Sequence, residues 1–72
     1  MYIIDNIFNL LKERNLTQIN MAKTIDVSSG NISDWKSGKA KPSISVIPKI
    51  ADYFNVSIDY LYGRTDNPEI NK

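Results

Sequence analysis

The stretch QINMAKTIDVSSGNISDWKSG, from Gln18 to Gly38, decides the fold of this chain. Thr17 stands just before it and can cap a first helix, because its hydroxyl can accept a hydrogen bond from an unpaired backbone N–H group. Asp26 follows that helix at a turn, and aspartate is one of the few non-glycine residues that accept the left-handed conformation. Ser28 offers a second N-cap, and Gly38 is suited to end the second helix. The stretch therefore predicts two short helices joined by a tight turn.

Apolar residues fall on one face of each of these helices. Met21, Ala22 and Ile25 share a face of the first, and Ala22 is small enough for two helices to cross closely. Ile32 and Trp35 stand three residues apart on the second, which places both in the core. Trp35 could also stack on a base, but its spacing from Ile32 favours the core.

The opposite side of the second helix is polar and has short side chains. It carries Gly30, Ser33, Asp34 and Ser37, with Ser29 and Asn31 on its flanks. A purely structural helix usually has Glu and Lys there, because they form helices better than Ser, Gly and Asn. Short side chains let a backbone approach a ligand, and their polar groups can bind phosphates or base edges. Two helices joined by a tight turn also match the geometry that sets a helix into a DNA major groove.

The composition argues against an enzyme. The 72 residues form one small domain and include neither cysteine nor histidine, so the commonest catalytic bases and metal ligands are missing. The eight carboxylates are scattered singly, and we expect no cofactor. No apolar run approaches the roughly 20 residues that a membrane span needs, and the opening MYIID lacks the features of a signal peptide. We expect a soluble cytoplasmic protein.

The net charge of +1 gives weak support for a nucleic-acid partner. Residues 1–41 carry six Lys and Arg against four acids, whereas residues 42–72 carry three against four. The densest basic group is Lys36, Lys39 and Lys41, just beyond the proposed second helix. Taken alone, this group would be interpreted as a solvated loop.

The rest of the chain predicts three more helices. Ile3, Ile7, Leu10 and Leu11 give residues 3–14 a helical period, with Phe8 at the edge of the apolar stripe. A fourth helix should begin near residue 46 with Ser45 as its cap, because Pro48 then falls in the first turn. Its expected inner face is Ile44, Ile47, Ile50, Ala51 and Phe54.

Ser57 can cap a short fifth helix over residues 58–62, which Gly63 closes. Leu61 should be buried, but Ile58, Tyr60 and Tyr62 cannot all be buried by so short a helix. Residues 65–72 are polar and aperiodic, which predicts a flexible tail or the start of a linker.

The segments TQINMAKTIDVSSGNISDWKSGKAKPS (17–43) and IADYFNVSIDYLYG (50–63) resemble the Cro/phage-repressor helix-turn-helix family, also called XRE-like. The resemblance covers about residues 3–64 and keeps the spacing of the TQ opening, Ala22, Ile32 and Trp35. It implies an all-α, compact five-helix lambda-repressor-like domain over residues 1–64. It also implies a repressor of the phage or prophage type that binds a palindromic operator in double-stranded DNA as a two-fold dimer. The candidate dimer surface runs from Val56 to Arg64.

The resemblance also assigns DNA contacts by position. Gln18 resembles the glutamine that holds a phosphate and supports the base-reading residues. Ser29, Gly30 and Asp34 stand where base edges are met, with Ser28, Asn31 and Ser33 beside them, and Ser37, Lys39 and Lys41 resemble the phosphate contacts. Capping and phosphate contact are compatible at Ser28.

The chain departs from the family pattern in two ways. Asp26 replaces the turn glycine, and the base-reading positions hold Ser, Gly and Asp in place of Gln, Arg or Lys. Asp34 would face a negatively charged groove, so it either has a structural or negative-selection role or accepts from a cytosine amino group. If the role of Asp34 is structural, we expect its carboxylate to form an ion pair with Lys36. With such short residues, DNA shape and bridging waters should contribute to specificity. The alternative function is a protein-interaction module, such as an antitoxin or an anti-repressor partner with the same fold.

Overall fold

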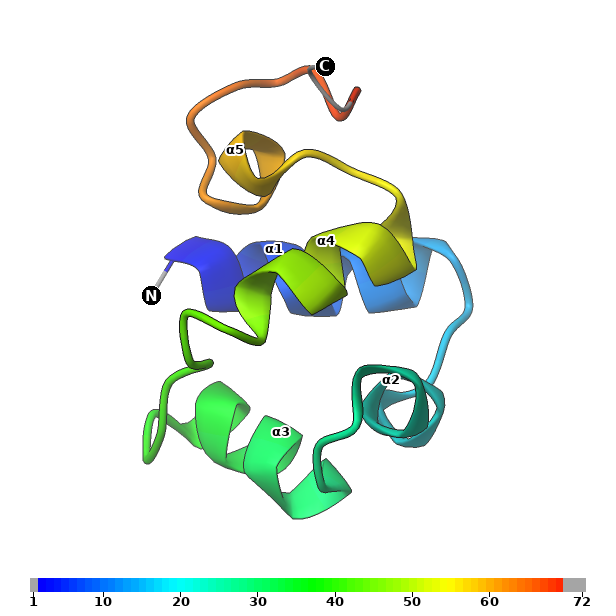
Figure 1. The fold of residues 1–72 in the computed structure, drawn as a ribbon, viewed down its shortest axis with the longest axis vertical. Helices are drawn as coiled ribbons and strands as arrows, with labels where there is room; N and C mark the ends of the chain where they lie inside the picture. The colour runs from blue at the N-terminus through cyan, green and yellow to red at the C-terminus, as the bar shows by residue number, and fades with distance from the viewer. Residues whose placement is uncertain (1, 70–72) are drawn as a thin grey trace.

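A computed structural model describes residues 2–69, which form five helices and no strand. The helices are α1 (Tyr2–Glu13), α2 (Gln18–Ile25), α3 (Ser29–Ser37), α4 (Ile47–Phe54) and α5 (Ile58–Leu61). In Figure 1, α5 lies at one end of the molecule and α3 at the other, with α1 and α4 between them. The all-α, five-helix prediction is confirmed.

All five helices contribute to one core. The buried apolar residues are Ile3, Ile4, Ile7, Leu10, Leu11, Met21, Ala22, Ile25, Ile32, Trp35, Ile47, Ile50, Ala51, Phe54, Val56 and Leu61. The inner faces predicted for the first three helices are among them, and Phe8 packs against the cluster from its edge. Burial of this apolar surface is the main stabilising contribution to so small a domain.

The start of α4 confirms one prediction and corrects two. The amides of Val46 and Ile47 both donate to the Ser43 carbonyl, at 3.0 and 3.2 Å, so a turn precedes the helix. Pro48 then falls in the first turn of α4, as predicted. Ser45 is not the cap, because Val46 stands at that position without a side-chain hydrogen bond, and the Ser45 hydroxyl pairs with that of Ser43 at 3.1 Å. Ile44 is 88% exposed rather than on the inner face, because it lies in the turn and outside the helix.

Each of the five helices is followed, within two residues of its last position, by a residue in the left-handed conformation. These residues are Asn15, Asp26, Gly38, Asn55 and Gly63, with φ between 54° and 84°. The amide of the next residue reaches back five positions in each case, to Leu11, Ala22, Asp34, Ala51 and Asp59. This is the Schellman arrangement, which satisfies the last carbonyls of a helix. The ends predicted at Asp26 and Gly38 are confirmed.

Side chains also join helices that are distant in sequence. Asn6 of α1 donates to the carbonyls of Tyr60 and Leu61 at 3.3 and 2.8 Å. Arg14, just after α1, donates to the Phe54 carbonyl at the end of α4 and lies 5.8 Å from the centre of the Phe54 ring. These contacts fix α1 against the C-terminal ends of α4 and α5.

Replacing Asn6 by alanine should destabilise the fold by about 1–2 kcal/mol, because two part-buried carbonyls lose a shared donor. For a domain of this size, that corresponds to a fall in Tm of roughly 4–16 °C, measurable by circular dichroism. Asn9→Ala is the matched control, since Asn9 lies on the exposed side of the same helix. Equal falls in Tm for the two variants would contradict the role of these hydrogen bonds.

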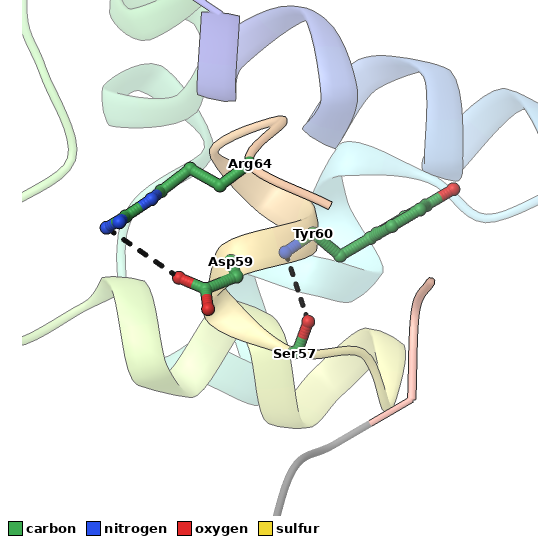
Figure 2. Close-up of polar contacts among 4 residues, drawn as sticks. All are labelled: Ser57, Asp59, Tyr60 and Arg64. Carbon is green, nitrogen blue, oxygen red and sulfur yellow. Dashed lines mark hydrogen bonds and ion pairs between the residues drawn. The ribbon is translucent and has the colours of Figure 1, made fainter. Parts of the chain in front are cut away.

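Around α5, local contacts hold the chain together (Figure 2). The Ser57 hydroxyl accepts from the Tyr60 amide at 3.0 Å, which confirms the predicted cap. Arg64 lies 4.0 Å from the Asp59 carboxylate, and both side chains are largely exposed. The helix ends at Leu61, one residue earlier than predicted.

The segment after α5 turns back toward its start, where the Ser57 amide donates to the Pro68 carbonyl at 2.9 Å. The assignment of residues 1–64 as the domain and residues 65–72 as a flexible tail or linker stays a prediction. Residues 70–72 lie outside the described residues.

Candidate nucleic-acid interface

The turn between α2 and α3 is built by local hydrogen bonds. The Thr17 hydroxyl accepts from the Asn20 amide at 3.1 Å, and the Ser28 hydroxyl accepts from the Asn31 amide at 3.1 Å. Asp26 is left-handed, with φ 60° and ψ 48°. Ile32 and Trp35 are buried, which fixes the rotation of α3 about its axis. Both caps, the turn residue and the inward face agree with the sequence-based predictions.

Because its inner side is fixed, α3 presents its polar residues outward. Ser28, Ser29, Gly30, Asn31, Ser33 and Ser37 are exposed, and Asp34 is half-buried. Gln18, at the start of α2, donates from Nε2 to the Ser33 hydroxyl at 3.3 Å. The structure therefore brings the start of α2 together with the outer face of α3.

The loop after α3 is held firmly against that helix. The amides of Lys39 and Ala40 both donate to the Asp34 carbonyl, at 2.9 and 3.3 Å, and the Ser37 hydroxyl donates to it at 3.2 Å. Ala40 packs against the core and Pro42 is buried, whereas Lys39 and Lys41 are exposed. Burial thus alternates along the loop, and the two exposed lysines are presented from an anchored backbone. The sequence did not predict that Pro42 would anchor this loop through its burial.

Lys36 separates from the basic group predicted in the sequence. Its ammonium lies 5.3 Å from the centre of the Phe8 ring of α1, a cation–π distance. Lys36 therefore contacts α1, and two lysines of the predicted group of three remain beside the outer face of α3.

Gly30 is not required by the fold. A Cβ built at this position would meet no atom closer than the Ser28 hydroxyl at 4.0 Å, and the residue lies inside α3. Glycine there costs helix stability without relieving a clash. Glycine at this position would be explained by a ligand whose atoms have to approach the backbone of α3 closely.

Gly30→Ala should therefore raise the stability of the fold by roughly 0.5–1 kcal/mol. On a surface that contacts DNA, as the sequence motifs predict for α3, the added methyl group should also weaken binding by a steric clash. The Tm of the variant and its Kd for a duplex enriched from a random DNA pool would be measured on the same preparation. Gly38→Ala is the contrasting variant, because its added Cβ meets nothing within 4 Å but φ is +84°. That variant should lose about 1 kcal/mol to backbone strain. If Gly30→Ala binds DNA like the wild type, close approach at this position is excluded.

The fold and this surface can be compared with known proteins. A family model described as Helix-turn-helix matches residues 7–61, which include α2, α3 and most of the core. This chain belongs to the Cro/phage-repressor helix-turn-helix family. The resemblance carried by its sequence motifs is thereby confirmed.

Three relatives illustrate the breadth of this helix-turn-helix family. The chain is 38% identical over 64 residues to the cryptic phage CTXphi transcriptional repressor RstR of Vibrio cholerae. It is 42% identical over 48 residues to the transcriptional activator BcrR of Enterococcus faecalis and 28% identical over 60 residues to the uncharacterised regulator YobD of Bacillus subtilis. These matches cover 89%, 67% and 83% of this chain and 57%, 24% and 54% of the relatives. The chain thus matches about half, or less, of each relative's length, and no solved structure gives a significant match.

The predicted dimer surface of this helix-turn-helix chain is only partly accessible. Val56 and Leu61 are 1% and 0% exposed, so they belong to the core and cannot contact a partner. Ile58 and Tyr62 are 41% and 38% exposed and form the apolar part that remains.

Among the described residues, no helix is long and apolar enough to cross a membrane.

Proposed function

We propose that this chain is a sequence-specific regulator of transcription that binds double-stranded DNA with α3 in the major groove. The observation that supports this proposal most is the outer face of α3, which is made of short polar side chains. The opposite side of the helix is fixed in the core by Ile32 and Trp35. Residues near the N-terminus of a second helix read base edges in this motif. RstR is a transcriptional repressor, BcrR a transcriptional activator and YobD a transcriptional regulator, and these relatives support the same function.

In this proposal, the site residues divide into two groups. Ser29, Gly30, Asn31, Ser33 and Asp34 face the base edges. Gln18, Ser28, Ser37, Lys39 and Lys41 hold phosphates on either side, since hydroxyls, amides and cations all bind phosphate oxygens. Gln18 also supports the reading surface through its hydrogen bond to Ser33.

We further propose a homodimer that acts as a repressor of the phage or prophage type on a palindromic operator. One recognition helix reads only a few base pairs, and a two-fold dimer spaces two such helices by about 34–36 Å along the duplex. The accessible apolar part of the candidate surface, Ile58 and Tyr62, is the dimer contact in this arrangement. An activator would use the same DNA-binding surface, and one of the relatives, BcrR, is a transcriptional activator.

The test is selection of binding sites from a random duplex pool at about 150 mM salt with competitor DNA, where non-specific electrostatic binding is weak. The expected product is a palindrome with half-sites about 10 base pairs apart. Failure to enrich any motif would overturn the operator-binding proposal.

A protein-interaction module is the second candidate, supported by the net charge of +1 and the exposed Ile58 and Tyr62. An antitoxin or anti-repressor partner would engage that apolar surface. Tight binding to such a partner without selective DNA binding would favour this function over the first.

A further inference from the structure

Asp34 is the acidic side chain on the outer face of α3, and its carboxylate forms no hydrogen bond or ion pair with the other described residues, 2–69. Among residues 2–69, no cation lies within 4.0 Å of it, since the ion pair found there joins Arg64 and Asp59. The nearest lysine along α3, Lys36, is placed over the Phe8 ring. A structural ion pair therefore does not explain this aspartate.

The polar contacts that Asp34 makes within the described residues come from its backbone. The Asp34 carbonyl accepts from the Lys39 and Ala40 amides and from the Ser37 hydroxyl, and these bonds anchor the loop after α3. Any residue at this position would supply the same carbonyl. The carboxylate of this half-buried residue is not needed for those bonds.

We propose that Asp34 is a specificity-determining residue that reads a cytosine at one position in each half-site of the operator. This inference rests on the proposed DNA-binding function. In the major groove, the cytosine edge offers the N4 amino group as a donor, whereas guanine offers two acceptors and thymine an acceptor and a methyl group. Adenine has a donor at N6, but its N7 acceptor lies beside it and repels a carboxylate.

The same chemistry gives Asp34 a role against other sequences. A carboxylate among phosphates raises the free energy of every complex in which it finds no donor. Cytosine compensates this repulsion with a hydrogen bond, and the other three bases do so poorly or not at all. The short neighbours Gly30, Ser33 and Ser37 leave room for α3 to bring the carboxylate to the groove floor.

The test is site selection with the wild type, Asp34→Asn and Asp34→Ala. The wild type should enrich cytosine at a fixed distance from the two-fold axis. The Asp34→Asn variant should shift that position to adenine, because a side-chain amide can donate to N7 and accept from N6. Asp34→Ala should lose the preference, and other positions should keep theirs. Replacing the cytosine should weaken wild-type binding roughly 5- to 150-fold, the range for one good base contact.

Asp52→Asn provides the matched control, since Asp52 is an exposed carboxylate on α4 and the variant makes the same change in net charge. It should raise affinity for all sequences slightly and leave the base preferences unchanged. A wild-type palindrome whose preferences persist in Asp34→Ala would overturn this inference and leave the operator-binding proposal standing. Recovery of no motif by the folded wild type would overturn both.

Discussion

Phe54→Ala is expected to unfold this domain at moderate temperature. Phe54 is fully buried at the end of α4, with its ring centre 5.0 Å from that of Tyr53 and 5.8 Å from the Arg14 guanidinium. Removing a buried phenylalanine ring costs about 3–5 kcal/mol, which combines lost burial with an unfilled cavity. A chain of 72 residues has a total stability of roughly 4–11 kcal/mol. The free energy lost in Phe54→Ala is therefore a large part of the free energy of unfolding of the whole domain.

The measurement is thermal and urea unfolding followed by circular dichroism, with an expected fall in Tm of roughly 12–40 °C. Ile44→Ala is the control, because it also removes a large apolar side chain, but one that is 88% exposed. That variant should stay within about 0.5 kcal/mol of the wild type. If Phe54→Ala melts within a few degrees of the wild type, Phe54 is not central to the core.

The paired substitution of Lys39 and Lys41 by alanine is expected to weaken DNA binding to all sequences alike. Both side chains are exposed on a loop whose backbone is bonded to α3 and anchored by the buried Pro42. Each lost phosphate contact removes about 0.9 from the slope of log Kobs against log salt, so the slope should become shallower by about two. At about 0.15 M salt, the affinity should fall roughly 10- to 100-fold. The selected base preferences should stay unchanged, because phosphate contacts carry no direct sequence information.

The measurement is a salt titration of the Kd for a selected operator and for a scrambled duplex. Lys12→Ala combined with Lys49→Ala is the matched control, because it removes the same charge from the exposed faces of α1 and α4. Its slope should equal that of the wild type. A double variant at Lys39 and Lys41 with an unchanged slope would show that neither side chain meets a phosphate.

Local rules were sufficient to predict the helix-turn-helix from sequence. The caps at Thr17 and Ser28 and the left-handed turn at Asp26 involve hydrogen bonds over three to five residues, so a short stretch contains the information needed. The inward positions of Ile32 and Trp35 follow from helical spacing alone. The match of the family model to residues 7–61 agrees with that interpretation.

The errors in prediction lie where local rules compete or distant segments meet. Ser45 has a hydroxyl that could cap α4, but the chain forms a turn before the helix in which the Ser43 carbonyl accepts the hydrogen bonds. In this turn the Ile44 side chain is exposed to solvent. Lys36 looks like a member of a basic cluster until α1 brings the Phe8 ring beneath it. Only the fold shows that a contact separated by 28 residues removes this cation from the group. The half-burial of the predicted dimer surface has the same origin, because α5 packs on α1 and α4.

The bonds from the Asp34 carbonyl to the loop have a mechanical consequence. Since the amides of Lys39 and Ala40 are bonded to the turn of α3 that carries Asp34, the backbone of this loop is held in place relative to the outer face of α3. In the proposed complex, a duplex whose phosphates do not match the spacing between this loop and α3 would have to bend or twist to contact both. The energy of that deformation depends on base steps that no side chain touches. Stiff and pliable operators with identical contacted bases should then be bound with different affinities.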